Sequence, residues 1–349
     1  MKSVDRPPRK RPLSMQLDLE RLCAPRKNRR ARDERGGALR AFLRNPAAVF
    51  GLAVLAILTL AIVLTPIVVP YSPSQIITVN GQRDRGAKNL GPFEYSDAEQ
   101  AAIAEGAYIF PHIFGTDELC RDYFVRVIYG ARVSLLTGLF ATLIVLVIGL
   151  VYGSISGYAG GAVDLVMMRV VDVIYALPDT LMVILFSVVL DQTLGDALAG
   201  TALARLGMNM LSMFIVFGAL YWVGMARLVR GQVLAIKTNE YVLAARALGA
   251  GPARILWRHI LPNCMPVVLT AATLQIPSAI FTESFLSFIG LGVQAPTPSL
   301  GALANAARGA LSSFPHKLVF PALLICLIVL AFNLLGDALR DALDPRLRR

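Results

Sequence analysis

Residues with catalytic or metal-binding chemistry are scarce in this 349-residue sequence. It contains no GxxxxGK[ST] phosphate loop, so we expect no nucleotide hydrolysis by this chain itself. GxSxG and HExxH are also missing, and no nucleophile and base stand at a recognisable spacing. The three histidines and four cysteines are scattered along the chain, which predicts neither a metal site nor a disulfide. We therefore predict a protein without catalytic residues.

Two polar side chains, Gln275 and Glu283, interrupt a long apolar segment at residues 265–291. Pro266 and Pro277 in the same segment would weaken the backbone hydrogen bonding of a helix. A polar or ionisable side chain at membrane depth marks by default a route for solute, so Gln275 and Glu283 are candidates for a translocation pathway. Hydrogen bonding inside a helix bundle is the alternative.

The chain around these residues is too apolar for a soluble domain. Hydrophobic residues make up 56% of it and charged residues 16%, and the mean hydropathy is +0.60. Six segments are long enough to cross a hydrocarbon core of about 30 Å, at residues 47–69, 133–157, 173–190, 208–225, 265–291 and 318–335. Because no alternating β-barrel pattern occurs, we predict an all-α polytopic membrane protein with six transmembrane helices.

Basic residues predict the orientation of these segments, because cytoplasmic loops retain Lys and Arg. With both termini in the cytoplasm, 25 of the 34 Lys and Arg residues fall on the inner side. The net charge of +11 then follows from topology. A nucleic-acid partner would also explain the basic N-terminus, but attraction to anionic lipid is the commoner cause. We therefore expect contact with the lipid bilayer and no nucleic acid.

Three regions flank the first segment. Residues 1–37 are Arg-rich and nearly devoid of aromatic side chains, which predicts a disordered basic cytoplasmic tail. Residues 38–46 place apolar side chains on one face of a short interfacial elbow helix. Residues 70–132 form an extracytoplasmic cap loop whose pattern is too irregular for an assignment of elements.

The end of this cap carries charged and aromatic residues directly before a membrane segment. Asp117, Arg121 and Asp122 are the candidates for contact with a partner outside the cell. A structural collar of ion pairs is the alternative.

A charged amphipathic island, residues 240–263, separates two apolar segments on the inner side. An apolar stripe that could dock on another molecule is formed at helical spacing by Tyr241, Ala244, Ala245 and Leu248. Gly249 and Gly251 interrupt this helix, and Pro252 suits the first turn of a second one. The pattern predicts two short helices around a glycine break, and an ordinary loop is the alternative.

Several stretches of the sequence follow a known pattern in the same order. They are FLRNPAAVFGL (42–52), FGTDELCRDYFVRVIYGARVSL (114–135), GYAGGAVDLVMMRVVD (157–172), AARALG (244–249) with Leu261 and Pro262 after it, ESFLSFIGLG (283–292) and NLLGDALRDALDPRLR (333–348). Together they resemble the permease subunits of binding-protein-dependent ABC importers, particularly the C-type subunit of the oligopeptide, dipeptide and nickel branch. The resemblance covers most of residues 38–348.

This resemblance implies a type I ABC importer permease fold in a bacterial or archaeal plasma membrane, with the permease core at residues 133–349. It also implies four kinds of partner: a second homologous permease, two ABC ATPase subunits, an extracytoplasmic substrate-binding protein and the lipid bilayer. ATP and Mg would be bound by the ATPases, and no cofactor by this chain. Coupling helices at residues 240–263 would dock on an ATPase through Glu240, Tyr241, Ala244, Ala245, Arg246, Gly249, Arg254, Leu261 and Pro262.

Two positions depart from the family pattern. The family has a Glu directly before its two alanines, where this chain has Leu243; Glu240 lies on nearly the same helical face and is a candidate substitute. The family usually has Gly where this chain has Cys120. The predicted function is import of oligopeptides or dipeptides. Import of nickel or another small solute, and an independent secondary transporter, are the alternatives.

Overall fold

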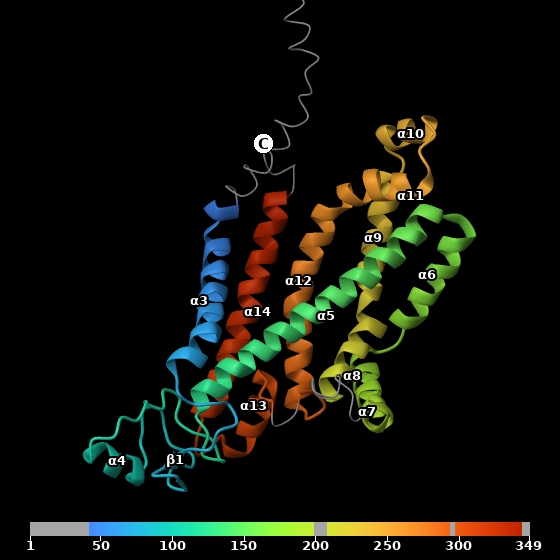
Figure 1. Ribbon diagram of the computed structural model, residues 1–349. Coiled ribbons are helices and arrows are strands. Elements are labelled where there is room, and N and C mark those ends of the chain that lie inside the picture. The colour runs from blue at the N-terminus through green and yellow to red at the C-terminus, as the bar shows by residue number, and fades with distance from the viewer. Residues whose placement is uncertain (1–41, 199–207, 294–296, 344–349) are drawn as a thin grey trace, which may run out of the picture.

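The computed structural model describes residues 42–198, 208–293 and 297–343, and long helices dominate it (Figure 1). In chain order its elements are α3 (Pro46–Val68), β1 (Thr78–Val79), β2 (Gln82–Arg83), α4 (Asp97–Ala104), α5 (Tyr123–Ala159), α6 (Gly161–Tyr175), α7 (Asp179–Leu198), α8 (Met208–Val216), the π-helix η2 (Phe217–Tyr221), α9 (Trp222–Ile236), α10 (Glu240–Ala247), α11 (Pro252–Ile255), the π-helix η3 (Leu256–Ile260), α12 (Leu261–Phe288), α13 (Leu300–Ala307), the 3-10 helix η4 (Arg308–Ala310) and α14 (His316–Leu343). The predicted tail at 1–37 lies outside the described residues, as does the first half of the predicted elbow helix.

Five helical stretches in the described residues are long and apolar enough to cross a membrane. They are Pro46–Val68, Tyr123–Ala159, Met210–Ile236, Pro252–Phe288 and His316–Leu343. They confirm the predicted all-α membrane fold. Most extend past the predicted ends, because the helical hydrogen bonding continues through the polar residues that border each apolar core.

The predicted third segment, residues 173–190, is not a single helix. α6 ends at Tyr175 and α7 begins at Asp179, with Pro178 directly before it. Proline lacks an N–H and disfavours a helical residue before it, which explains the break. Because α5 and α9 both end on the same side of the molecule (Figure 1), the chain returns between them through α6 and then α7. The count of six spans stays a prediction.

The two sides of the molecule differ. α3 begins and α14 ends on the side where α10 and α11 lie, and the cap built around α4 and β1 occupies the opposite side (Figure 1). This arrangement agrees with the predicted topology, in which the basic island, the start of the first segment and the end of the last segment share the inner side (Figure 1). The cap is fixed to α14 by Phe114, whose ring stacks on Phe320 with centroids 3.9 Å apart.

Glycines bring α5 and α9 into close contact. Gly149, Gly153 and Gly157 recur every fourth residue on α5, and a Cβ atom at Gly153 would lie 2.4 Å from the carbonyl oxygen of Ala226 on α9. Small residues at this spacing let membrane helices approach closely. α9 therefore has a fixed position, and this position sets where α10 begins.

Candidate functional site

The island between α9 and α12 folds as two short helices around a glycine, with α10 before the break and α11 after it. Gly249 has φ +80°, and the Ala250 N–H donates to the carbonyl oxygen of Ala245 at 3.1 Å, which closes the end of α10. Glycine adopts this left-handed conformation without the strain that a Cβ would cause. Gly251 has φ −67°, a value open to any residue. The structure therefore places the break at Gly249.

Two apolar side chains hold this helix–glycine–helix unit against the rest of the chain. Val242 of α10 and Ile255 of α11 are buried, with exposed fractions of 0% and 1%. They join one core cluster with Val233 of α9 and Val268 of α12. Burial of each such side chain contributes about 1.5–3 kcal/mol. The unit is therefore packed against both α9 and α12.

The opposite side of α10 exposes an apolar surface. Tyr241, Leu243 and Leu248 are 43%, 49% and 89% exposed. Ala244 is also exposed, and Ala245 is half-buried. Large apolar side chains gathered on one exposed helix mark a contact with another molecule. The predicted stripe is thus available to a partner.

The other predicted contact residues divide by exposure. Glu240, Arg246, Arg254 and Pro262 are exposed, whereas Leu261 is buried at the start of α12. Leu261 therefore packs inside the chain, and its contact with an ATPase stays a prediction. Sequence reasoning missed Trp257 of η3, which is 66% exposed beside the same unit. Its signal was a tryptophan in a basic inner loop, the setting of an interface aromatic.

Ion pairing ties the base of this unit to α6. Arg230 of α9 donates two hydrogen bonds to the Asp164 carboxylate, at 2.5 and 2.6 Å, and Ser156 of α5 donates another at 2.5 Å. The hydrogen bonds from Arg230 hold the pKa of Asp164 at about 2. Lys237, just after α9, donates to the carbonyl oxygen of Gly157 at 2.9 Å. The unit therefore sits on a base formed by α5, α6 and α9.

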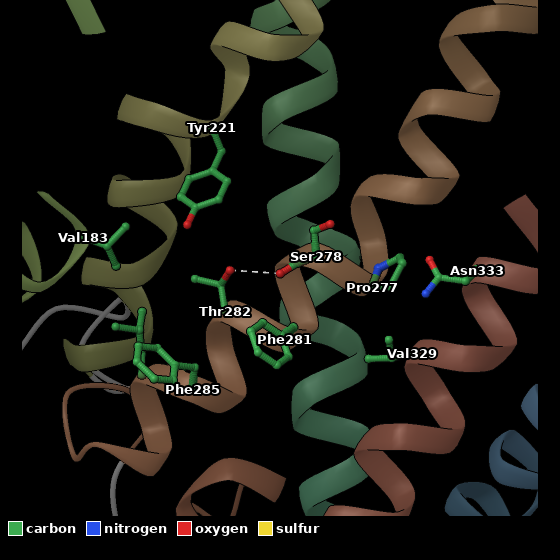
Figure 2. Close-up of a pocket in the computed structure, with 10 residues that line it drawn as sticks. Val183, Tyr221, Pro277, Ser278, Phe281, Thr282, Phe285, Val329 and Asn333 are labelled. Atoms are coloured by element: carbon green, nitrogen blue, oxygen red, sulfur yellow. Dashed lines mark hydrogen bonds between the residues drawn. The ribbon is translucent and has the colours of Figure 1, made fainter. Parts of the chain in front are cut away.

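A cavity of about 600 Å³ lies along α12. Figure 2 shows Phe281, Thr282 and Phe285 of α12 around it, with Tyr221 of η2 nearby. The other residues that line it are Val183, Pro277, Ser278, Leu286, Val329 and Asn333. Because these walls are uncharged and combine apolar side chains with hydroxyl and amide groups, they suit a solute that must enter and leave without being held strongly.

The two predicted pathway residues have different surroundings. Gln275 is half-buried and lines a second cavity beside the break between α6 and α7. Glu283 is fully buried, and its carboxylate accepts hydrogen bonds from Ser134 of α5 at 2.7 Å and from Ser287 at 2.8 Å. The structure therefore places the Glu283 carboxylate inside the bundle, where these hydroxyls satisfy its hydrogen-bonding capacity. Its role in a translocation pathway stays a prediction.

The three predicted outside-contact residues lie within the cap. Arg121 Nε donates to Asp117 at 2.7 Å, and Arg126 lies 3.3 Å from the same carboxylate. Asp122 accepts from the Val125 N–H at 2.9 Å as the N-cap of α5. Asp117 and Asp122 are only 8% and 2% exposed, and both carboxylates accept hydrogen bonds from neighbours in the cap, as the ion-pair collar predicts. Their contact with a partner outside the cell stays a prediction.

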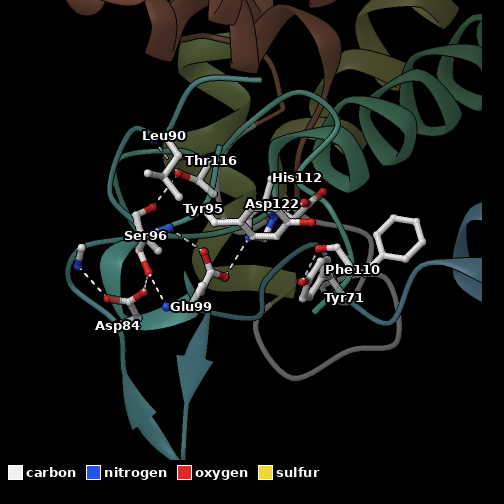
Figure 3. A network of polar contacts seen from close by, with 12 residues as sticks. Tyr71, Asp84, Leu90, Tyr95, Ser96, Glu99, Phe110, His112, Thr116 and Asp122 are labelled. Atoms are coloured by element: carbon white, nitrogen blue, oxygen red, sulfur yellow. Dashed lines mark hydrogen bonds and ion pairs between the residues drawn. The ribbon is translucent and has the colours of Figure 1, made fainter. Parts of the chain in front are cut away.

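A buried histidine that the sequence did not single out is central to the cap. His112 lies between Glu99 and Asp122 (Figure 3), with Nε2 3.0 Å from Glu99 Oε1 and Nδ1 2.8 Å from Asp122 Oδ2. Burial alone lowers the pKa of His112, but the hydrogen bonds to Asp122 and Glu99 outweigh it and raise the pKa to about 9. One signal was available in the sequence, since Ser96 and Glu99 have the spacing of a capping box.

At the left-handed position of Cys120, φ is +60°. The family resemblance implies glycine here, and the chain keeps the turn that glycine would allow. The thiol is buried and packs in a small cluster with Ile77 and Ala87. The departure at Cys120 therefore leaves the local fold intact.

Membrane helices, an exposed helix–glycine–helix unit on one side, an uncharged cavity along α12 and a folded cap on the other side (Figure 1) are the features expected of a transport permease. Residues 149–349 match the model of the binding-protein-dependent transport system inner membrane component, and residues 36–92 match the N-terminal transmembrane domain of oligopeptide transport permease C. The first match covers more than half of the chain. The chain therefore belongs to the family of binding-protein-dependent inner-membrane permeases, and it is a multi-pass protein of the inner membrane.

Similar proteins carry names of the same kind. The oligopeptide transport system permease protein OppC of Haemophilus influenzae is 38% identical over 313 residues, 88% of each chain. The dipeptide transport system permease protein DppC of Bacillus subtilis is 50% identical over 239 residues, 68% of this chain and 70% of that protein. An inward-facing structure of the MetNI methionine ABC transporter matches with a TM-score of 0.45 and 20% identity, over 61% of this chain and 95% of that one.

Proposed function

We propose that this chain is one permease subunit of an ATP-driven importer of oligopeptides or dipeptides and forms half of its pore. A second homologous permease supplies the other half, and a substrate-binding protein delivers the peptide outside. The names of the similar permeases and the match over residues 36–92 support peptides as the substrate class. The chain itself is non-catalytic, binds no cofactor and has no nucleic-acid partner; ATP and Mg are bound by two ATPase subunits.

The observation that carries this proposal is the unit formed by α10 and α11. Tyr241 and Leu248 expose apolar side chains, whereas Val242 and Ile255 anchor the same unit in the core. A partner that binds Tyr241 and Leu248 can therefore move the helices against which Val242 and Ile255 pack. Because α11, η3 and α12 follow one another without a loop, movement of the unit reaches the helix that lines the cavity. This is how ATPase closure would switch the pore between its two openings by rigid-body movement.

The test is uptake by the complete importer in sealed vesicles, with its binding protein outside and ATP inside. We expect labelled trialanine to enter only with ATP and only when both permeases and the ATPases are present. Uptake by this chain alone would instead identify a secondary transporter. Accumulation of nickel in place of peptide would be consistent with the importer architecture but would refute peptides as its substrate.

A further inference from the structure

A second cavity, of about 450 Å³, lies where α6 gives way to α7. Its walls come from this break, from η2 with the first turn of α9, and from Gln275 of α12. Tyr175 and Leu177 line it at the break, where the helical hydrogen-bond ladder stops before Pro178. Broken membrane helices and π-helices are both features that recur at binding sites, because they leave backbone groups free for a ligand.

A cationic side chain stands at the edge of this cavity. Arg227 lies one turn after Val223 of the cavity wall, and its guanidinium carbon is 4.2 Å from the ring centre of Tyr175. Its NH2 group donates to Asp172 at 2.8 Å. The side chains of Arg227 and Asp172 remain 37% and 51% exposed. The pair is therefore open to whatever occupies the space beside it.

The position of this pair along the chain decides what that space contains. Arg227 lies two residues after the predicted apolar segment 208–225, and Asp172 lies directly before the segment 173–190. Charged residues that border a membrane segment lie at the level of the lipid headgroups and of water. The exposed pair therefore faces water or a polar ligand at the inner end of the helices.

The charge of the cluster is positive. Arg169 of α6 reaches the same Asp172 carboxylate, at 3.9 Å, so two guanidinium groups share one carboxylate. Gln275 adds an amide, whose side chain has no hydrogen bond within residues 42–198, 208–293 and 297–343. A guanidinium binds a carboxylate through paired N–H groups, and an amide can both donate to and accept from a peptide bond.

We propose that this cavity binds the C-terminal end of a peptide in transit, with the peptide carboxylate on Arg227 and the adjoining peptide bond on Gln275. The proposal rests on the proposed function, and it assigns recognition to a part of the peptide that every sequence shares. Side chains of the peptide would then extend into the uncharged cavity along α12. Such a site accepts many peptides and rejects those without a free carboxylate.

The experiment measures protection of a cysteine placed in the cavity wall. Leu177→Cys, 41% exposed in the wild-type chain, is introduced with the natural cysteines replaced by serine. The purified complete importer is labelled with a thiol reagent while trialanine or trialanine amide is added. We expect trialanine to slow labelling and the amide, which lacks the carboxylate, to have little effect. Equal protection by the two, or none by either, would overturn the proposal.

Variants of Arg227 separate binding from structure. Arg227→Gln should weaken protection by trialanine roughly 10- to 100-fold, the loss expected for a hydrogen bond to a charged group, whereas Arg227→Lys should keep most of it. The double variant Asp172→Asn with Arg227→Gln removes the ion pair as a unit and should still lack protection. Restored protection in the double variant would show that Arg227 has only a structural role. If the wild type imports trialanine but trialanine does not slow labelling, the peptide site is refuted and the proposed function is not. If the wild type imports no trialanine, the proposed function itself is contradicted.

Discussion

Replacing Gly249 by alanine separates the backbone geometry of the docking unit from its contacts. A Cβ atom at Gly249 would meet no atom within 4 Å, so strain at φ +80° is the only cost. For a residue other than glycine this strain is about 1–2 kcal/mol. Gly251 also has open space around it, but its φ is −67°. Gly251→Ala therefore adds the same methyl group without the strain and is the matched control.

The assay is ATP-driven uptake of trialanine by the complete importer, with membrane insertion and complex assembly checked for each variant. A cost of 1–2 kcal/mol changes a population by roughly 5- to 30-fold, so we expect uptake by Gly249→Ala to fall by up to that factor. Gly249→Asn should fall less, because asparagine tolerates the left-handed region better. Equal uptake by Gly249→Ala and Gly251→Ala would refute the reasoning.

Three further perturbations test the helices that hold this unit and the cap on the opposite side of the molecule. Gly153→Ala should lower the free energy of unfolding by about 1–3 kcal/mol because its Cβ meets backbone of α9, whereas Gly224→Ala, in open space, should not; thermal unfolding in detergent compares the two. The imidazolium of His112 should stabilise the cap fully below about pH 6.5, its ordinary pKa, and this stability should be lost as the pH rises through about 9. Proteolysis of the cap should therefore accelerate near pH 9 in the wild type, but not in His112→Gln. Asp164→Asn removes the charge held by Arg230 and should speed amide hydrogen exchange in α6; unchanged exchange would show that the Arg230–Asp164 ion pair does not stabilise α6.

The membrane helices and the docking unit were predictable from sequence because each is a local pattern. A run of apolar residues long enough to cross lipid has few alternatives to a helix. Gly249 and Pro252 mark the end of one helix and the start of the next within four positions. The exposed stripe on α10 follows from helical spacing alone.

The buried polar sites were not predictable, because they depend on residues far apart in the chain. Glu283 and Ser134 are 149 positions apart, and the fold brings them within 2.7 Å. His112 gains its partners from α4 and from the N-cap of α5, in a cap without a regular pattern. The third segment was predicted as one helix because hydropathy does not register the break before Pro178. In each case the missing information concerns tertiary structure.

Copurification in mild detergent tests the central claim most directly, namely that α10 and α11 form the docking site for a separate ATPase. Wild-type protein should bring with it an ATPase and a second permease. Leu248→Asp, which puts a charge on the 89% exposed side chain of the docking surface, should lose the ATPase and keep the permease. Wild-type protein that copurifies with neither subunit, or a Leu248→Asp variant that retains the ATPase as fully as the wild type, would contradict the claim.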